Sequence, residues 1–308
     1  MASQKDVKTR IASVKNIHKI TRAMEMVAAA RLRRAEQRIE ALRPYAGAIR
    51  KVTKQVADAA GGSVSRVPVL EPREDVKTAG ILLVTGDRGL AGAFNSQIVR
   101  EGIRLRHMFE ADGTNVVFFV VGRRGASTLR FRGEELVESF EGFTDRPAFA
   151  NAREIGSRLT TGYIDRDLDR VELVYNRYVS PLTQYVRRHT LLPLQEAEVF
   201  GAGIVESEET AEGDEELMAA HQRALWFYEP DPEEALAKLF AEYVDLSVFR
   251  ALLESTASEH GARMTAMRNA AENANEMIDD LTLEMNRARQ AEITQEILEV
   301  VAGAEALG

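Results

Sequence analysis

Both ends of this 308-residue chain carry long stretches of helical sequence without a helix breaker. No proline occurs before Pro44 and no glycine before Gly47, and between residues 233 and 302 the one breaker is Gly261. Within both stretches apolar residues recur at steps of three and four, which is the spacing of a coiled-coil seam. A helix of this length cannot bury its apolar stripe alone, so each stretch needs a partner helix.

The seam can be predicted residue by residue in each stretch. In the first helix it runs through Val7, Ile11, Val14, Ile17, Ile20, Met24, Val27, Leu32, Ala35, Ile39, Leu42, Ala46, Ile49, Val52 and Val56. In the last helix it runs through Leu239, Tyr243, Leu246, Arg250, Leu253, Ala257, His260, Met264, Met267, Ala271, Ala274, Ile278, Leu281, Met285 and Ala288, and then shifts to Ile293, Ile297 and Val301. Asp231-Pro232 is a typical start for the last helix.

The charges of the chain are unevenly distributed. Residues 1–60 hold 14 Lys+Arg against 5 Asp+Glu, a net charge of +9, whereas residues 205–308 hold 7 against 24, a net charge of -17. Such asymmetry indicates that each end meets an oppositely charged partner or that the ends meet each other. An antiparallel pairing of the two terminal helices buries both apolar seams and places the basic helix beside the acidic one. A helical bundle or a dimeric coiled coil is the alternative.

The middle of the chain alternates strand and helix patterns. Residues 81–84 and 116–121 are continuous apolar runs, as in parallel strands covered on both faces. Residues 92–108 read as a helix, 171–174 as a strand, and 178–182 as a turn into residues 184–192. We therefore predict an α/β fold in four parts: an N-terminal coiled-coil helix (1–60), a small doubly wound, Rossmann-like α/β domain (61–204), an acidic insertion or linker (205–230) and a C-terminal coiled-coil helix (231–308).

The motif from Thr85 to Gly92 follows a strand and precedes a helix, where α/β folds hold phosphates. Its glycines run G-x-x-G-x-x-G, which is neither the dinucleotide fingerprint nor a P-loop, so a structural turn is favoured. The absence of cysteine excludes thiolate metal sites and cysteine nucleophiles, and the five histidines lack metal-ligand spacing. No catalytic, cofactor or metal site is predicted, and the basic residues of the first helix are spread along the seam, unlike those of a nucleic-acid-binding arm.

Four segments carry a resemblance to a known family. They are ITRAMEMVAAA at 20–30, TGDRGLAGAFN at 85–95, SEHGARM at 258–264 with Met267–Ala270, and RQAEITQEI at 289–297 with VVAGA at 300–304. Together they resemble the gamma subunits of bacterial F-type ATP synthases, nearly end to end and in family order. Relatives with a regulatory cysteine pair differ from this chain, and the insertion at 204–230 is longer than the family core.

The resemblance implies the function of a rotor. In that family the terminal helices form a coiled coil inside a hexamer of alpha and beta subunits, and the α/β domain contacts the epsilon subunit and the ring of c subunits. Proton flow turns the shaft, and the catalytic sites belong to the other subunits. The resemblance thus implies a non-catalytic subunit, peripheral on the cytoplasmic face of the cell membrane; a coiled-coil scaffold or nucleic-acid-binding protein with an α/β domain is the alternative.

The resemblance also implies contact residues, matched by position. The beta-subunit contacts fall on Arg289, Gln290, Thr294, Glu296, Met24, Lys19 and Arg22. The sliding bearing falls on Ala302, Gly303 and Ala304.

The complementary charges generate a test of the pairing. A peptide of residues 1–60 is expected to be weakly helical alone and to gain helix when residues 231–308 are added, because each peptide supplies the other's apolar seam. Circular dichroism of the separate and mixed peptides measures this, and high salt should weaken the effect through screening. Full helicity of the dilute first peptide alone would contradict it.

Overall fold

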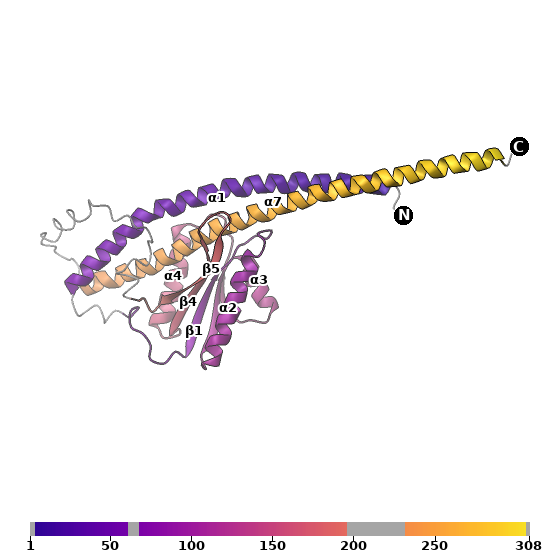
Figure 1. Ribbon diagram of the computed structural model, residues 1–308. Helices are drawn as coiled ribbons and strands as arrows, with labels where there is room; N and C mark the ends of the chain where they lie inside the picture. The colour runs from indigo at the N-terminus through magenta and orange to yellow at the C-terminus, as the bar shows by residue number, and fades with distance from the viewer. Residues whose placement is uncertain (1–3, 61–67, 196–231, 306–308) are drawn as a thin grey trace. The chain divides into compact units, whose positions relative to one another are not determined.

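The computed structural model describes residues 4–60, 68–195 and 232–305, which form two compact units (Figure 1). We call residues 1–30 and 263–308 the shaft unit, and residues 31–262 the sheet unit. The predicted acidic insertion lies outside the described residues. The elements are α1 (Gln4–Ala60), β1 (Thr78–Val84), α2 (Phe94–Ala111), β2 (Asn115–Val121), α3 (Arg123–Phe131), β3 (Leu136–Phe140), α4 (Phe149–Ile164), β4 (Arg170–Tyr178), β5 (Gln184–Leu192) and α7 (Pro232–Glu305).

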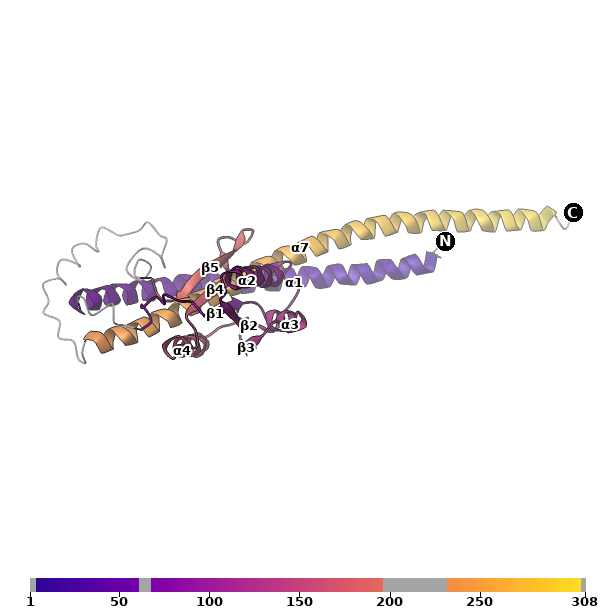
Figure 2. The same ribbon diagram turned by 90° about the horizontal axis from the view of Figure 1, so that it is seen from below.

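The shaft unit is an antiparallel pair formed by the first part of α1 and the second part of α7, which lie side by side in Figures 1 and 2. Val7 and Ile11 pack against Leu281, whereas Glu25, further along α1, meets Arg268, which lies earlier in α7. Partner positions therefore run in opposite directions along the two helices. This confirms the predicted fold class of two long antiparallel terminal helices with an α/β domain.

The seam of α1 differs from the predicted one over about three turns. Ile17, Ile20 and Val27 are more than half exposed, although the apolar pattern placed them inside. The structure instead continues the strict alternation of four and three residues from Val14, and none of the positions on this alternation is exposed: His18, Thr21, Glu25, Ala28 and Leu32. The predicted seam is wrong here because it followed hydrophobicity through two consecutive steps of three, which rotates the stripe around the helix.

Val52 is a second error in the predicted seam, since it is exposed while Thr53 is fully buried. The hydroxyl of Thr53 donates a hydrogen bond to the carbonyl oxygen of Ile49 at 2.8 Å, which satisfies this polar group inside the seam. In α7, by contrast, every predicted seam position from Leu239 to Ala288 is buried or half-buried.

The buried acid Glu25 is held by two arginines. Its Oε2 accepts a hydrogen bond from Nη1 of Arg22 at 2.6 Å, and its Oε1 accepts one from Nε of Arg268 at 3.1 Å. Burial alone would raise the pKa of Glu25, but these hydrogen bonds and charges outweigh it, so that the pKa lies below its usual value. A charged residue at a seam position fixes which residue faces which, because any slip leaves it unpaired.

The sheet unit contains a five-stranded sheet in the order β3-β2-β1-β4-β5. The first four neighbours are parallel, and β5 returns antiparallel to β4 after the predicted turn. Two helices on each face bury the sheet: α2 and α3 cover Ile81 and Leu83 of β1, whereas α4 and the first part of α7 cover Leu82 and Val84. Among the described helices none is long and apolar enough to cross a membrane.

The Glu25 cluster generates a stability prediction. Glu25→Gln should lower the free energy of unfolding of the chain by about 1 kcal/mol, because two charge-assisted hydrogen bonds to partly exposed arginines are weakened. The measurement is thermal or urea unfolding of the full chain near neutral pH. The matched control is Glu272→Gln, an exposed glutamate of α7. Equal stabilities of the two variants would show that the cluster contributes nothing to the pairing.

Candidate functional site

The carboxyl edge of the parallel strands is where an α/β fold binds ligands, at the point where the strand order reverses. Here β1 lies between β2 and β4, so that point is the end of β1, followed by Thr85, Gly86 and Asp87. Thr85 is buried, and its hydroxyl donates to the carbonyl oxygen of Val121 at 2.6 Å and accepts from the backbone N–H of Gly125 at 3.1 Å. These contacts tie the end of β1 to the end of β2 and the start of α3.

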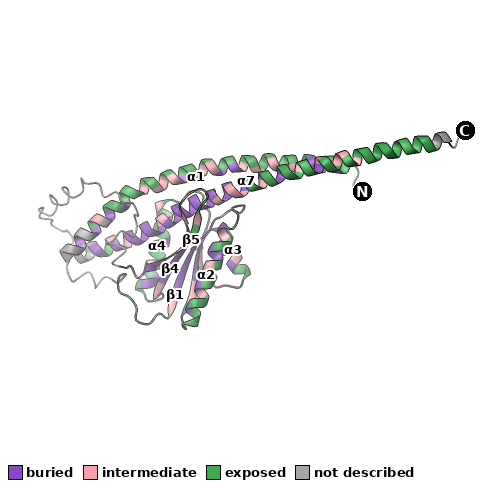
Figure 3. Ribbon diagram, in the orientation of Figure 1, coloured by how far each residue is buried: buried purple, intermediate pink, exposed green. Residues whose placement is uncertain are grey.

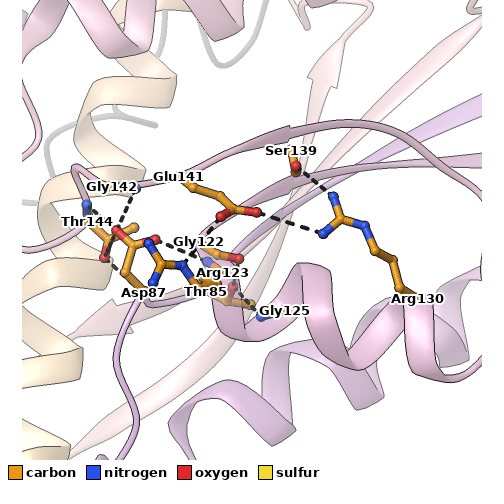
Figure 4. Close-up of polar contacts among 10 residues, drawn as sticks. All are labelled: Thr85, Asp87, Gly122, Arg123, Gly125, Arg130, Ser139, Glu141, Gly142 and Thr144. Atoms are coloured by element: carbon orange, nitrogen blue, oxygen red, sulfur yellow. Dashed lines mark hydrogen bonds and ion pairs between the residues drawn. The ribbon is translucent and has the colours of Figure 1, made fainter.

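At this edge of the sheet, the carboxylate of Asp87 lies where a ligand anion would bind in other α/β folds (Figure 4). Its Oδ1 accepts from the backbone N–H of Arg123 at 3.1 Å, at the start of α3. Its Oδ2 accepts from the backbone N–H groups of Gly142 at 2.9 Å and Thr144 at 3.1 Å, and from the Thr144 hydroxyl at 3.0 Å. Partial burial would raise the pKa of Asp87, but these hydrogen bonds outweigh it and lower the pKa. The amides that would cradle a phosphate are thus used by a side chain of the protein.

Helix α7 fills the rest of the crevice. Its Ser255 donates to the carbonyl oxygen of Val84 at 3.2 Å, and its Ser258 donates to that of Asn176, at the end of β4, at 3.0 Å. Glu259 is buried so close to Gly86 that a Cβ there would stand 2.7 Å from its carboxylate. A cavity of about 10 Å³ is left beside these residues. This agrees with the prediction of a structural turn between Thr85 and Gly92.

The end of α7 is the most exposed part of the shaft unit. From Arg289 to Ala302 every residue is exposed, as the long green stretch of α7 towards the C-terminus in Figure 3 shows. Ile293, Ile297 and Val301 form an exposed apolar row at steps of four. The cause is geometric: Leu281 and Met285 already pack against the first turns of α1, so α7 continues past its partner (Figure 2).

The residues matched to beta-subunit contacts lie in two places on the shaft unit. Arg289, Gln290, Thr294 and Glu296 are all on the exposed end of α7, and the Thr294 hydroxyl donates to the Gln290 carbonyl oxygen at 2.9 Å. On α1, Lys19 and Arg22 are exposed and Met24 is half-buried. The structure adds that Arg22 is engaged with Glu25, which the sequence pattern missed.

The residues matched to the bearing lie at the end of the same helix. Ala302 is exposed, and Gly303 and Ala304 belong to α7 but their exposure lies outside what the structure describes. The described residues contain no group of three or more His, Asp or Glu side chains that could hold a metal ion.

Comparisons with known proteins agree on one family. The sequence model of the family described as ATP synthase matches residues 3–307. The ATP synthase gamma chain of Rubrobacter xylanophilus is 43% identical over 307 residues, covering 100% of this chain and 99% of that relative. A protein of Acetobacterium woodii named "ATP synthase gamma chain, sodium ion specific" is 40% identical over 305 residues and covers 98% of each chain.

Solved structures give the same result. The central stalk and c-ring structure of the Tetrahymena thermophila mitochondrial ATP synthase contains a chain with a TM-score of 0.59 and 28% identity, covering 82% of this chain and 99% of that one. A chain of the Euglena gracilis mitochondrial ATP synthase rotor has a TM-score of 0.62 at 19% identity, covering 94% of this chain and 98% of that one, which supports the fold alone.

The Asp87 cluster generates a pH-dependent prediction. Asp87→Asn should destabilise the full chain by about 2–4 kcal/mol at neutral pH, because several hydrogen bonds to a charged acceptor are lost. The folded pKa lies below the unfolded value of about 3.9, so this stabilisation is complete above that value and is lost as the pH falls through the folded pKa.

The difference between wild type and Asp87→Asn should therefore narrow in acid, which urea unfolding at a series of pH values measures. Asp112→Asn, at an exposed position after α2, is the control. A difference that stays constant down to the most acidic pH would contradict the assigned role of the carboxylate.

Proposed function

The chain belongs to the ATP synthase family, and from this membership we propose that it is the gamma subunit that forms the rotating central shaft of an F-type enzyme. The observation that carries the proposal is the exposed end of α7, where Arg289 to Ala302 continue beyond α1 with an uncovered apolar row. A stiff helix end that exposes Ile293, Ile297 and Val301 needs an enclosing partner, because apolar side chains gain by leaving water.

The partner that fits this end is the hexamer of alpha and beta subunits. A cavity lined by several copies of two subunits can surround a single helix, and weak contacts repeated around it allow the helix to turn. Ala302, Gly303 and Ala304 supply small surfaces for such a bearing. Hydrogen bonds that form and break in each rotational step come from Arg289, Gln290, Thr294 and Glu296. A second contact with the beta subunit comes from Lys19, Arg22 and Met24.

Transmission of torque requires that the two helices do not slide along each other. The Glu25 contact with Arg268 and the buried seam of Val7, Ile11 and Leu281 resist such sliding. The chain would thereby couple proton flow through the ring of c subunits to ATP synthesis in the hexamer, with the epsilon subunit as a further partner. It would lie at the cytoplasmic face of the membrane and reach the membrane through these partners.

A non-catalytic role fits the sheet unit. Its ligand crevice is filled by Ser255, Ser258 and Glu259 of α7, and its anion position is taken by Asp87. In this proposal the α/β fold is a rigid mount for the long helices, and the catalytic sites belong to the partner subunits.

The proposal predicts a coupling defect for changes at the end of α7. Arg289→Ala combined with Gln290→Ala should leave the fold unchanged, since both side chains are exposed. ATP turnover and proton pumping of the reconstituted complex should fall by about tenfold or more, because a lost hydrogen bond to a charged group costs roughly 1.5–3 kcal/mol where it is made.

The matched control is Arg100→Ala with Gln97→Ala, the same residue types at exposed positions of α2. Normal assembly with wild-type rates in the shaft variant would refute the assignment of Arg289 and Gln290. A complex that fails to assemble would show that they hold the shaft in place and do not act in each step.

A further inference from the structure

A second cavity in the sheet unit has a charge that the proposed function does not use. It has a volume of about 360 Å³ and is lined by residues of α1, α7 and the loop between β3 and α4. Four of its lining residues are arginines, namely Arg31, Arg34, Arg38 and Arg146, and its one lining carboxylate is Asp145. A volume of this size is at the lower end of the range of small-molecule sites.

Three of these arginines are concentrated on one face of α1. Arg31, Arg34 and Arg38 follow each other at steps of three and four, so their guanidinium groups are neighbours along the helix. Ala35 lies between them and is buried, and its small side chain leaves the space in front of it open. Like charges at this spacing repel each other and destabilise a helix unless an anion lies between them.

Asp145 compensates for only part of this charge. Its Oδ2 is 2.8 Å from Nη1 of Arg31 and 3.3 Å from Nη2 of Arg88. Within the described part of the chain, no carboxylate lies within ion-pair distance of Arg34, Arg38 or Arg146. The cavity therefore keeps a positive charge for which the described residues provide no counterion.

The other oxygen of Asp145 adds a second, independent observation. Oδ1 is buried and has no hydrogen-bond donor among the described residues. A buried acceptor without a partner costs free energy, and a ligand that brings both negative charge and a proton to donate would satisfy this oxygen together with the arginines.

From these two observations we infer that this cavity binds a phosphate group. A phosphate near neutral pH carries negative oxygens that match the forked N–H groups of arginine, and it retains a proton that can be donated to Asp145 Oδ1. Sulfate has the same shape but no proton at this pH, so it would place an oxygen against a carboxylate oxygen. The volume exceeds that of one phosphate, which leaves room for a polyphosphate chain or for the phosphates of a nucleotide.

Such a ligand would add a property beyond the proposed function of the shaft. A phosphate bound to Arg34 and Arg38 of α1 and to Arg146 of the loop would connect these elements through charge-assisted hydrogen bonds. The stiffness of the helix mount would then depend on the concentration of the phosphate compound.

The test is binding to the purified full-length chain at constant ionic strength near neutral pH. Sodium phosphate is titrated by calorimetry and followed by thermal unfolding, with sodium sulfate and sodium chloride as matched salts. Phosphate should raise the melting temperature with increasing concentration, because a ligand that binds only the folded state stabilises it. Tripolyphosphate and ATP, titrated separately without magnesium, identify whether the phosphate group comes from a free ion, a chain or a nucleotide.

Arg34→Gln with Arg38→Gln should weaken phosphate binding by roughly tenfold for each arginine removed. Arg33→Gln with Arg43→Gln is the control, because it removes two exposed arginines of the same helix that do not line the cavity. Asp145→Asn should bind sulfate and phosphate alike, since an amide can donate to either anion.

Three results would overturn the inference. One is equal phosphate affinity in the two double variants, and another is equal affinity of the wild type for phosphate and sulfate. The third is binding of a Glu-rich and Asp-rich peptide without any binding of phosphate, which would identify the cavity as a docking surface for an acidic protein segment.

Discussion

The pairing of α1 with α7 is the constraint on which the rest of the structure depends. Helices of 57 and 74 residues carry more apolar surface than either can cover, and each covers the other's stripe. Hydrophobic burial does not by itself fix the register, because alanine-rich seams pack almost equally well after a shift. The polar seam residues of α1, and Glu25 with Arg268 in particular, supply the specificity that apolar contacts lack.

Helix α7 also fills the crevice in which an α/β fold of this kind usually binds a ligand. Parallel strands with helices on both faces create a ligand crevice at the end of β1, and here Ser255, Ser258 and Glu259 of α7 close it. Asp87 binds the amides that would otherwise bind an anion. A fold typical of nucleotide binding thus holds a helix in place of a nucleotide, and polar groups at the ends of β1 and β4 bind Ser255 and Ser258 of α7.

The sequence allowed the long helices, the α/β class and the turn between β4 and β5 to be predicted, because breakers, apolar runs and turn residues are local signals. It did not reveal the seam positions His18, Thr21 and Glu25, because their burial depends on partners such as Arg268 that lie far away in the sequence. A strict heptad count from Val14 would have found them. The short strand β3 was missed because its five residues include a glutamate and a serine, and α3 and α4 also went unpredicted.

For the candidate sites, too, the sequence revealed some features, and others required the structure. The motif of Asp87 was visible in the sequence, but its four hydrogen bonds join residues up to 57 positions apart and required the structure. The contact residues at the end of α7 came from family resemblance, and the structure contributes their exposure. The arginine cavity had no sequence signal beyond the charge of α1, because Arg146 and Asp145 reach it from a distant loop.

The central claim is that this chain turns inside its partners, and rotation of single complexes tests it most directly. Because the chain has no cysteine, Arg100→Cys on α2 provides one attachment point for a bead, while the alpha and beta subunits are fixed to a surface. The account predicts continuous rotation of the bead in one direction during ATP hydrolysis. A bead that stays in one orientation, on complexes that hydrolyse ATP at a normal rate, would contradict it.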